Sequence, residues 1–101
     1  MRAPAPESMR SHGAVLRLLV RNHPGVMSHI SGLFARRAFN VDGIVCVPIA
    51  DATQSTVWLL VREDQQLDQL VRQLGKLEDV VTIERDGAGL AVFDAVRVYV
   101  Q

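Results

Sequence analysis

The sequence predicts an α+β domain in which four antiparallel strands form one sheet and two helices cover one of its faces. Four short apolar runs rich in β-branched residues alternate with two segments whose apolar residues recur at helical spacing. Their order is strand, helix, strand, strand, helix, strand, which is the split βαβ, or ferredoxin-like, arrangement. The chain has 101 residues, of which 49% are hydrophobic and 22% charged, as expected for one globular domain.

The first strand and the first helix are joined by a proline-containing turn. The strand is predicted over residues 14–20, a short apolar run. Pro24 fits the first turn of the helix, where its missing N–H is not needed, and it favours an extended, N-capping conformation for His23. An apolar stripe continues the helix to Phe39, and Asn40 is expected to end it in a left-handed conformation. The members of that stripe are Val26, Met27, Ile30, Leu33 and Phe34.

The second and third strands are predicted over residues 41–49 and 56–61. The first of these contains Gly43 and Pro48, which indicates the edge of the sheet, because proline cannot donate a hydrogen bond to a central strand ladder. Cys46 lies among apolar neighbours and is expected to be a buried small side chain. Residues 56–61 are almost continuously apolar, as in an inner strand.

The second helix is predicted to be capped by Asp64, and the fourth strand follows over residues 80–84. The helix buries a stripe made by Leu67, Leu70, Val71, Leu74 and Leu77. Both crossovers should be right-handed, which places both helices on one face of the sheet. A Gly-rich hinge opens a C-terminal extension, residues 87–101, which reads either as another strand or as a short helix. Residues 1–12, rich in Pro, Ser and charge, are expected to form a loose tail.

Composition excludes several classes of function. Eleven basic residues balance eleven acidic ones, so no net charge attracts nucleic acid, and Trp58 is the one aromatic residue available in the predicted central strands for stacking RNA bases. No run of eighteen apolar residues indicates a membrane span, and no signal peptide is evident. The single cysteine suits a reducing compartment. A cytoplasmic protein that binds neither nucleic acid nor membrane is expected.

No group of residues predicts catalysis or metal binding. His23 and His29 are six residues apart, on different sides of a helix, and no paired cysteines or Asp-rich loop accompanies them. We expect a capping His23 and a surface His29. No nucleophile with a neighbouring base and no acid–base pair is recognisable.

The junction between the first strand and the first helix is the candidate binding site. The start of a helix presents unpaired N–H groups and the positive end of its dipole, which favour a carboxylate ligand. Gly25 has no side chain to block that ligand, and the side-chain amide of Asn22 offers donors and an acceptor for an amino acid. Alternatively, Asn22 and His23 only cap the helix, and these residues alone do not decide between the two roles.

Three blocks of sequence resemble the regulatory (small) subunit of acetohydroxyacid synthase, also called acetolactate synthase. They are residues 21–27 (Arg-Asn-His-Pro-Gly-Val-Met), residues 32–41 (Gly-Leu-Phe-Ala-Arg-Arg-Ala-Phe-Asn-Val) and residues 76–80 (Lys-Leu-Glu-Asp-Val). The resemblance implies an ACT domain, here over residues 13–86, that binds a branched-chain amino acid and has no catalytic activity of its own. It also implies a partner, the catalytic large subunit, which uses thiamine diphosphate, magnesium and FAD. No cofactor is expected in this chain, which looks like the short, valine-sensitive type.

The family positions carried over are Asn22, Gly25 and Asn40. The full set of expected effector-binding residues is Asn22, His23, Pro24, Gly25, Val26, Met27, Asn40 and Val41. Strands one and two of this fold run parallel, so Asn40 should lie at the opposite end of the sheet from Asn22. Antiparallel pairing of the edge strands 41–49 of two chains would bring Asn40 of one towards Asn22 of the other. A homodimer that holds valine between them is therefore expected; the alternatives are an ACT-type sensor of a different enzyme and a small enzyme.

Overall fold

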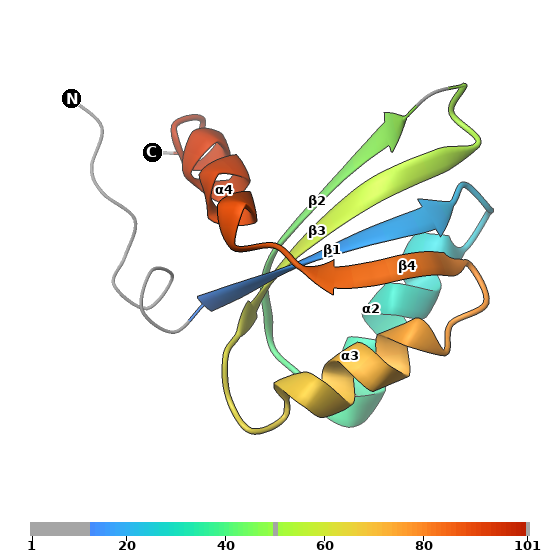
Figure 1. The fold of residues 1–101 in the computed structure, drawn as a ribbon, viewed down its shortest axis with the longest axis horizontal. Coiled ribbons are helices and arrows are strands. Elements are labelled where there is room, and N and C mark those ends of the chain that lie inside the picture. Colours follow the sequence, from blue (N-terminus) through green and yellow to red (C-terminus); the bar gives the residue numbers. More distant parts are fainter. Residues whose placement is uncertain (1–12, 50, 101) are drawn as a thin grey trace.

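The computed structural model describes residues 13–49 and 51–100 and contains one four-stranded antiparallel sheet. Its strands, in the spatial order β2-β3-β1-β4, are β1 (Gly13–Arg21), β2 (Val41–Ile49), β3 (Gln54–Arg62) and β4 (Val80–Arg85). Two helices, α2 (Val26–Arg37) and α3 (Leu67–Gly75), cover the same face (Figure 1). The predicted α+β, ferredoxin-like fold is confirmed. The tail predicted for residues 1–12 lies outside the described residues.

The main core lies between the sheet and these two helices. Alternate residues of the inner strands point towards the helices, and the paired Leu16 and Leu59 are both fully buried. The other buried members of this core are Leu18, Val20, Val26, Ile30, Leu33, Phe34, Val57, Val61, Leu67, Leu70 and Leu74. Removing each such side chain from water stabilises the fold by roughly 1.5–3 kcal/mol. The hydrophobic pattern of the sequence therefore predicted the layers correctly.

The start of α2 differs from the prediction. Val26 N–H donates to the carbonyl of His23 at 3.1 Å, and Gly25 between them has φ +91° and ψ −2°. This is a type II turn with Pro24 in its second position and glycine in its third, where a positive φ is required. Pro24 thus lies before the helix and His23 is not its N-cap; the helix begins at Val26 because the Pro-Gly pair forms its own turn.

The end of α2 also lies earlier than predicted. Ala38, not Asn40, is in the left-handed conformation, with φ +55° and ψ +32°. The N–H of Phe39 then donates back to the carbonyl of Phe34 at 3.1 Å, and the two rings pack edge to face with centroids 6.5 Å apart. This aromatic contact across the helix end is typical of Schellman-type termini and explains why the turn forms before Asn40.

β2 is an edge strand, as its glycine and proline predicted, and its pairing with β3 is irregular between Val41 and Gly43. The expectation of a buried Cys46 is wrong, because this side chain is exposed. Cys46 pairs with Val57 and so faces the helix side of the sheet. β2 is at the edge, however, and no further strand or helix of the described residues covers Cys46. The apolar neighbours of Cys46 in the sequence indicated a strand but not its place in the sheet.

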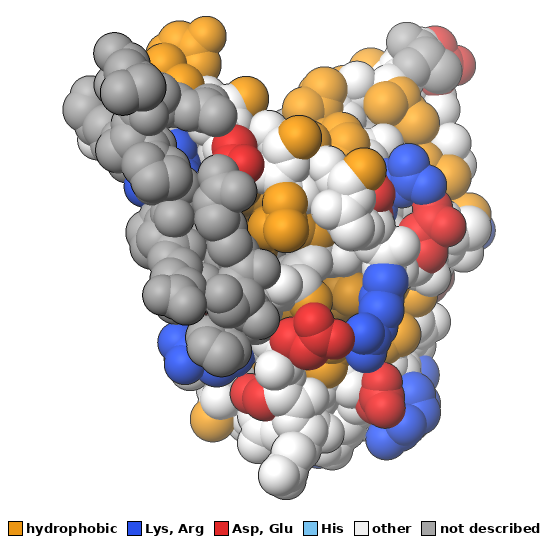
Figure 2. All heavy atoms as spheres, turned by 60° about the vertical axis from the view of Figure 1, so that its left-hand side comes forward, with side chains coloured by type: hydrophobic (Ala, Val, Ile, Leu, Met, Phe, Trp, Pro, Cys, Tyr) orange, Lys and Arg blue, Asp and Glu red, His pale blue; other side chains and the backbone are white. Residues whose placement is uncertain are grey.

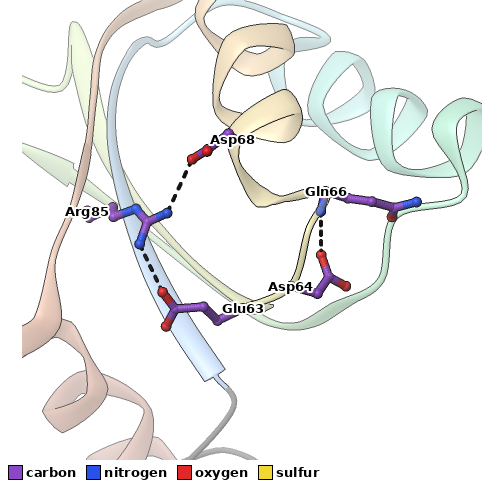
Figure 3. A network of polar contacts seen from close by, with 5 residues as sticks. All are labelled: Glu63, Asp64, Gln66, Asp68 and Arg85. Atoms are coloured by element: carbon purple, nitrogen blue, oxygen red, sulfur yellow. Dashed lines mark hydrogen bonds and ion pairs between the residues drawn. The ribbon is translucent and has the colours of Figure 1, made fainter.

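β4 forms the other edge, and charged side chains lie around its last residue, Arg85. Arg85 Nη1 lies 2.9 Å from Glu63 Oε1, and Arg85 Nη2 lies 3.4 Å from Asp68 Oδ1 on α3 (Figure 3). Asp64 does not cap α3 directly. Its Oδ1 accepts the N–H of Gln66 at 2.8 Å, which forms a turn one step before the helix starts.

The C-terminal extension forms a short helix, which decides between the two alternatives left open. A 3-10 turn at Gly87–Gly89 leads into α4 (Leu90–Arg97), and α4 lies on the sheet face opposite α2 and α3 (Figure 1). Phe93 is buried there against Val15 and Leu60. Gly43 makes room for it, because a Cβ at that position would lie 2.7 Å from Phe93 Cε1. None of the helices in the described ranges is long and apolar enough to cross a membrane.

Candidate effector site

The expected binding segment, residues 22–27, lies at the end of the sheet where β1 passes into α2. We call it the effector segment. Its first four residues are exposed, Met27 is half-buried, and Val26 is buried in the main core. Val26 therefore cannot offer its side chain to a ligand, and its N–H donates to the carbonyl of His23. The segment is open to solvent at the point where the sequence placed the site.

Asn22 is tied to the neighbouring β2–β3 hairpin. Its Nδ2 donates to the carbonyls of Ala52 at 2.6 Å and Gln54 at 3.3 Å, and its Oδ1 accepts from Ser55 Oγ at 2.5 Å. Its backbone N–H also donates to the Thr53 carbonyl at 2.9 Å. The donors and the acceptor that the sequence analysis assigned to a ligand are thus all in use. In this structure Asn22 anchors the effector segment to the hairpin.

The hairpin that receives Asn22 is itself fixed by a short polar turn. Asp51 Oδ1 accepts from the hydroxyl of Thr53 at 2.7 Å and from its N–H at 3.1 Å. These hydrogen bonds lower the pKa of Asp51, so the carboxylate stays ionised until the pH falls below the ordinary aspartate range. The stability that this turn contributes is present above that range and is lost in acid. Ala52, between the two residues, has φ +66°.

The start of α2 is free of side-chain caps. Gly25 occupies the N-cap position, and neither a capping hydrogen bond nor an acidic residue in the first turn is present there. Val26 N–H closes the Pro-Gly turn and His29 N–H donates to the Gly25 carbonyl at 2.9 Å. The N–H groups between them, of Met27 and Ser28, form no hydrogen bond within the described residues. Free N–H groups at the positive end of a helix dipole attract an anion such as a carboxylate.

Asp79, which sequence reasoning did not single out, lies on the other side of the effector segment. It belongs to the turn between α3 and β4, and its side chain is 11% exposed. Its Oδ2 lies 3.6 Å from His23 Nδ1 and 3.9 Å from His29 Nδ1. The segment is therefore held from two sides, by the hairpin through Asn22 and by Asp79 through the two histidines.

Asn40 and Val41 are not near the effector segment within one chain. Val41 is level with Val61 and hence with Ala14 at the start of β1, whereas Asn22 follows the end of β1. A nine-residue strand spans about 25–30 Å, so the two asparagines lie at opposite ends of the sheet. This geometry agrees with the predicted parallel course of β1 and β2, and it leaves the expected site divided in a single chain.

The described residues contain no cluster of three or more His, Cys, Asp or Glu side chains that could hold a metal ion. The exposed Cys46 lies on β2, away from the histidines. What the site can do chemically is bind a small anion or zwitterion through backbone N–H groups.

Sequence reasoning missed the residues that support the site from a distance. Counted over the whole residue, Ser55 is 2% exposed and Asp79 9% exposed. Both are buried polar residues in segments that read as ordinary strand and turn. No signal in the sequence separates Asp79 from the neighbouring Glu78, which lies between the same two apolar residues, Leu77 and Val80, and is exposed.

Comparisons with known proteins give concordant results. A family model described as the AHAS small subunit-like ACT domain matches residues 16–82. The acetolactate synthase isozyme 1 small subunit of Escherichia coli K12 is 54% identical over 87 residues, 86% of this chain and 91% of that relative.

Two solved structures extend these likenesses to the fold. The acetolactate synthase small subunit of Thermotoga maritima has a TM-score of 0.67 at 32% identity, covering 74% of this chain and 48% of that one. The ACT domain of the GTP pyrophosphokinase of Chlorobium tepidum has a TM-score of 0.62 at 25% identity, covering 74% of this chain and 97% of that one.

Proposed function

Because this chain belongs to the family of acetolactate synthase small subunits with an ACT domain, we propose that it is the regulatory subunit of such an enzyme. It binds valine at an interface between two of its own copies and transmits feedback inhibition to a catalytic large subunit, which it activates in the absence of valine. Thiamine diphosphate, magnesium and FAD belong to that catalytic partner.

The observation that carries the proposal is the uncapped start of α2. Among the described residues, no group accepts a hydrogen bond from the N–H groups of Met27 and Ser28. Gly25 places no side chain in front of them, and a Cβ at this position would have no described atom within 4 Å. An amino acid can approach with its α-carboxylate towards these groups, where the helix dipole favours negative charge. The ammonium group and the side chain then need partners that one chain does not supply.

A second copy of the chain supplies those partners. β2 is an edge strand that pairs with β3 on one side only in the described structure, and its exposed side chains include Ile44, Val47 and Ile49. Figure 2 shows hydrophobic side chains exposed across the upper part of the molecule, above a part where acidic and basic side chains alternate. Pairing β2 with its copy in antiparallel fashion buries this edge and brings Asn40 of the partner to the end of the sheet that holds Asn22.

Feedback then needs only a difference in affinity between two states of the holoenzyme. Valine at the interface fixes the relative orientation of the two chains and orders the effector segment, which alters the surface offered to the catalytic subunit. A coupling free energy of about 1–3 kcal/mol, or roughly 5- to 150-fold in affinity, is the usual range for such effects. Isoleucine and leucine differ from valine by one methylene, so their affinities for the site should lie within about 10- to 200-fold of the affinity for valine.

The test is calorimetric titration of the full chain with valine, together with two variants at one position. Gly25→Asp adds a negative charge in front of the free N–H groups, and Gly25→Asn adds nearly the same shape without the charge. Both strain the backbone alike, because φ is +91° there. We expect Gly25→Asp to weaken valine binding at least tenfold more than Gly25→Asn, with the dimer intact. Equal effects of the two variants would contradict a carboxylate at this position.

A second candidate is an ACT-type sensor that regulates a different enzyme, since a solved relative of this fold is part of a GTP pyrophosphokinase. Both candidates share the valine site. Co-purification with the catalytic subunit of acetolactate synthase separates them, because only the first requires a stable complex and valine-sensitive acetolactate formation.

A further inference from the structure

The burial of Asp79 is offset by His23, which lies within the effector segment, and by His29, two residues after it. A carboxylate withdrawn from water destabilises the fold unless it is paired or hydrogen-bonded. The distances from its Oδ2 to the Nδ1 atoms of His23 and His29, 3.6 and 3.9 Å, are within ion-pair range but longer than a good hydrogen bond. The side chains of both histidines are about 60% exposed.

The positions of these histidines link Asp79 to both sides of Gly25. The carbonyl of His23 accepts the N–H that closes the Pro-Gly turn, and the N–H of His29 donates to the Gly25 carbonyl in the first turn of α2. The backbone of Asp79 is fixed in turn, because its carbonyl accepts Arg21 N–H at 2.8 Å. Asp79 therefore connects the end of β1, the turn and the start of α2.

We propose that Asp79 is a positioning residue for the effector segment and that protonation of His23 and His29 strengthens its hold, so that valine binds more tightly as the pH falls from about 8 to about 6. This inference rests on the proposed valine site. Protonation changes each contact from a neutral imidazole near a carboxylate to an ion pair, which is the stronger interaction. A segment already held in place loses less conformational freedom when the effector binds, and affinity rises accordingly.

Two further charged residues of the described part of the chain are adjacent to Asp79, Glu78 in the sequence and Arg21 through its backbone N–H. The guanidinium of Arg21 donates to the carbonyl of Glu78 at 2.8 Å, next to Asp79 in the chain. Histidine is the side-chain type whose ordinary titration falls between about pH 5 and 8, so the pH dependence is assigned to His23 and His29. Glu78 is exposed and adjacent, which makes Glu78→Gln a matched control for the loss of one negative charge.

The experiment measures the affinity of the full chain for valine by calorimetry at about pH 6 and about pH 8. We expect the wild type and Glu78→Gln to bind about two- to fivefold more tightly at the lower pH, as befits partly exposed ion pairs. Asp79→Asn should show no such difference. The double variant His23→Gln with His29→Gln should behave likewise, and since both imidazoles are exposed it tests the idea even where Asp79→Asn does not fold. A wild-type pH difference that persists in either variant would overturn the proposal.

Amide hydrogen exchange without valine separates this inference from the proposed function. The protection factors of the Val26 and His29 amides should be higher at the lower pH in the wild type and equal at both pH values in Asp79→Asn. If the wild type does not bind valine, the proposed function fails, and the protection factors alone decide whether Asp79 holds the segment. If valine binds but the protection factors and affinities of Asp79→Asn follow those of the wild type, only the inference about Asp79 fails.

Discussion

The two edge strands of the sheet, β2 and β4, differ in length and in the number of charged side chains. β2 has nine residues with a single charged side chain, Asp42, whereas β4 has six residues that include Glu84 and Arg85. Each of these two forms ion pairs, Glu84 with Arg17 and Arg85 with Glu63 and Asp68. β2 forms no ion pair within the described residues, and its exposed side chains are mostly apolar.

This difference favours β2 over β4 as the edge of the proposed dimer. Short and charged strands discourage pairing with another chain, and β4 is both. An irregular register does not separate the two edges, because it occurs in the pairing of β4 with β1 and of β2 with β3. A long, apolar and almost uncharged edge has the opposite effect and stays soluble only if something pairs with it. The proposed dimer through β2 follows from this contrast between the two edges.

The largest expected effect comes from placing a charge on each edge in turn. Val47 on β2 is 44% exposed and Val81 on β4 is 42% exposed, so they form a matched pair. Val47→Lys should raise the dimer dissociation constant on the order of tenfold or more, because two lysines must then be desolvated at the interface. Val81→Lys should leave it unchanged. Analytical ultracentrifugation over a range of concentrations measures the dissociation constants of both variants. Equal dissociation constants would contradict the proposed difference between the two edges.

A smaller effect is expected when the charges of β4 are removed. Arg85→Ala deletes both ion pairs to Glu63 and Asp68, whose side chains are half or more exposed. Because exposed ion pairs contribute little, the free energy of unfolding in urea should fall by no more than about 1 kcal/mol, and less at high salt. The dimer should be unaffected. A loss above about 2 kcal/mol would mean that these pairs stabilise the packing of α3 as well as the edge.

The sequence predicted the strands and helices well because their signals are local. β-branched runs and a 3.6-residue stripe correspond to single elements, and Pro48 correctly indicated an edge strand. The turn at Pro24 and the helix end at Ala38 were not predicted. Each depends on a positive φ at one residue, Gly25 or Ala38, and a neighbouring residue offered a plausible alternative for the helix boundary. The exposure of Cys46 is consistent with the edge position that Pro48 indicated, and the expectation of burial was wrong because it rested on the apolar neighbours of Cys46 in the sequence alone.

The sequence indicated one segment as the candidate site, and the contacts that support this segment were not predicted. The family resemblance and the helix start both directed attention to Asn22 and Gly25, and the structure indeed leaves N–H groups free there. The bonds of Asn22 to the hairpin and the contacts of Asp79 with two histidines join residues 30 or more positions apart. Contacts of that kind depend on how the elements pack, and the spacing of residues in the sequence does not predict them.

A valine site shared by two chains can be tested by mixing two variants, each of which should fail to bind valine on its own. Asn22→Ala and Asn40→Ala should each lose valine binding as homodimers. In a mixed dimer one site combines both substitutions, and the other combines the intact Asn22 of one chain with the intact Asn40 of the other. After subunit exchange at equal concentrations, calorimetry should therefore detect wild-type affinity at about one quarter of the sites. No recovery of binding in the mixture would contradict a site built from two chains.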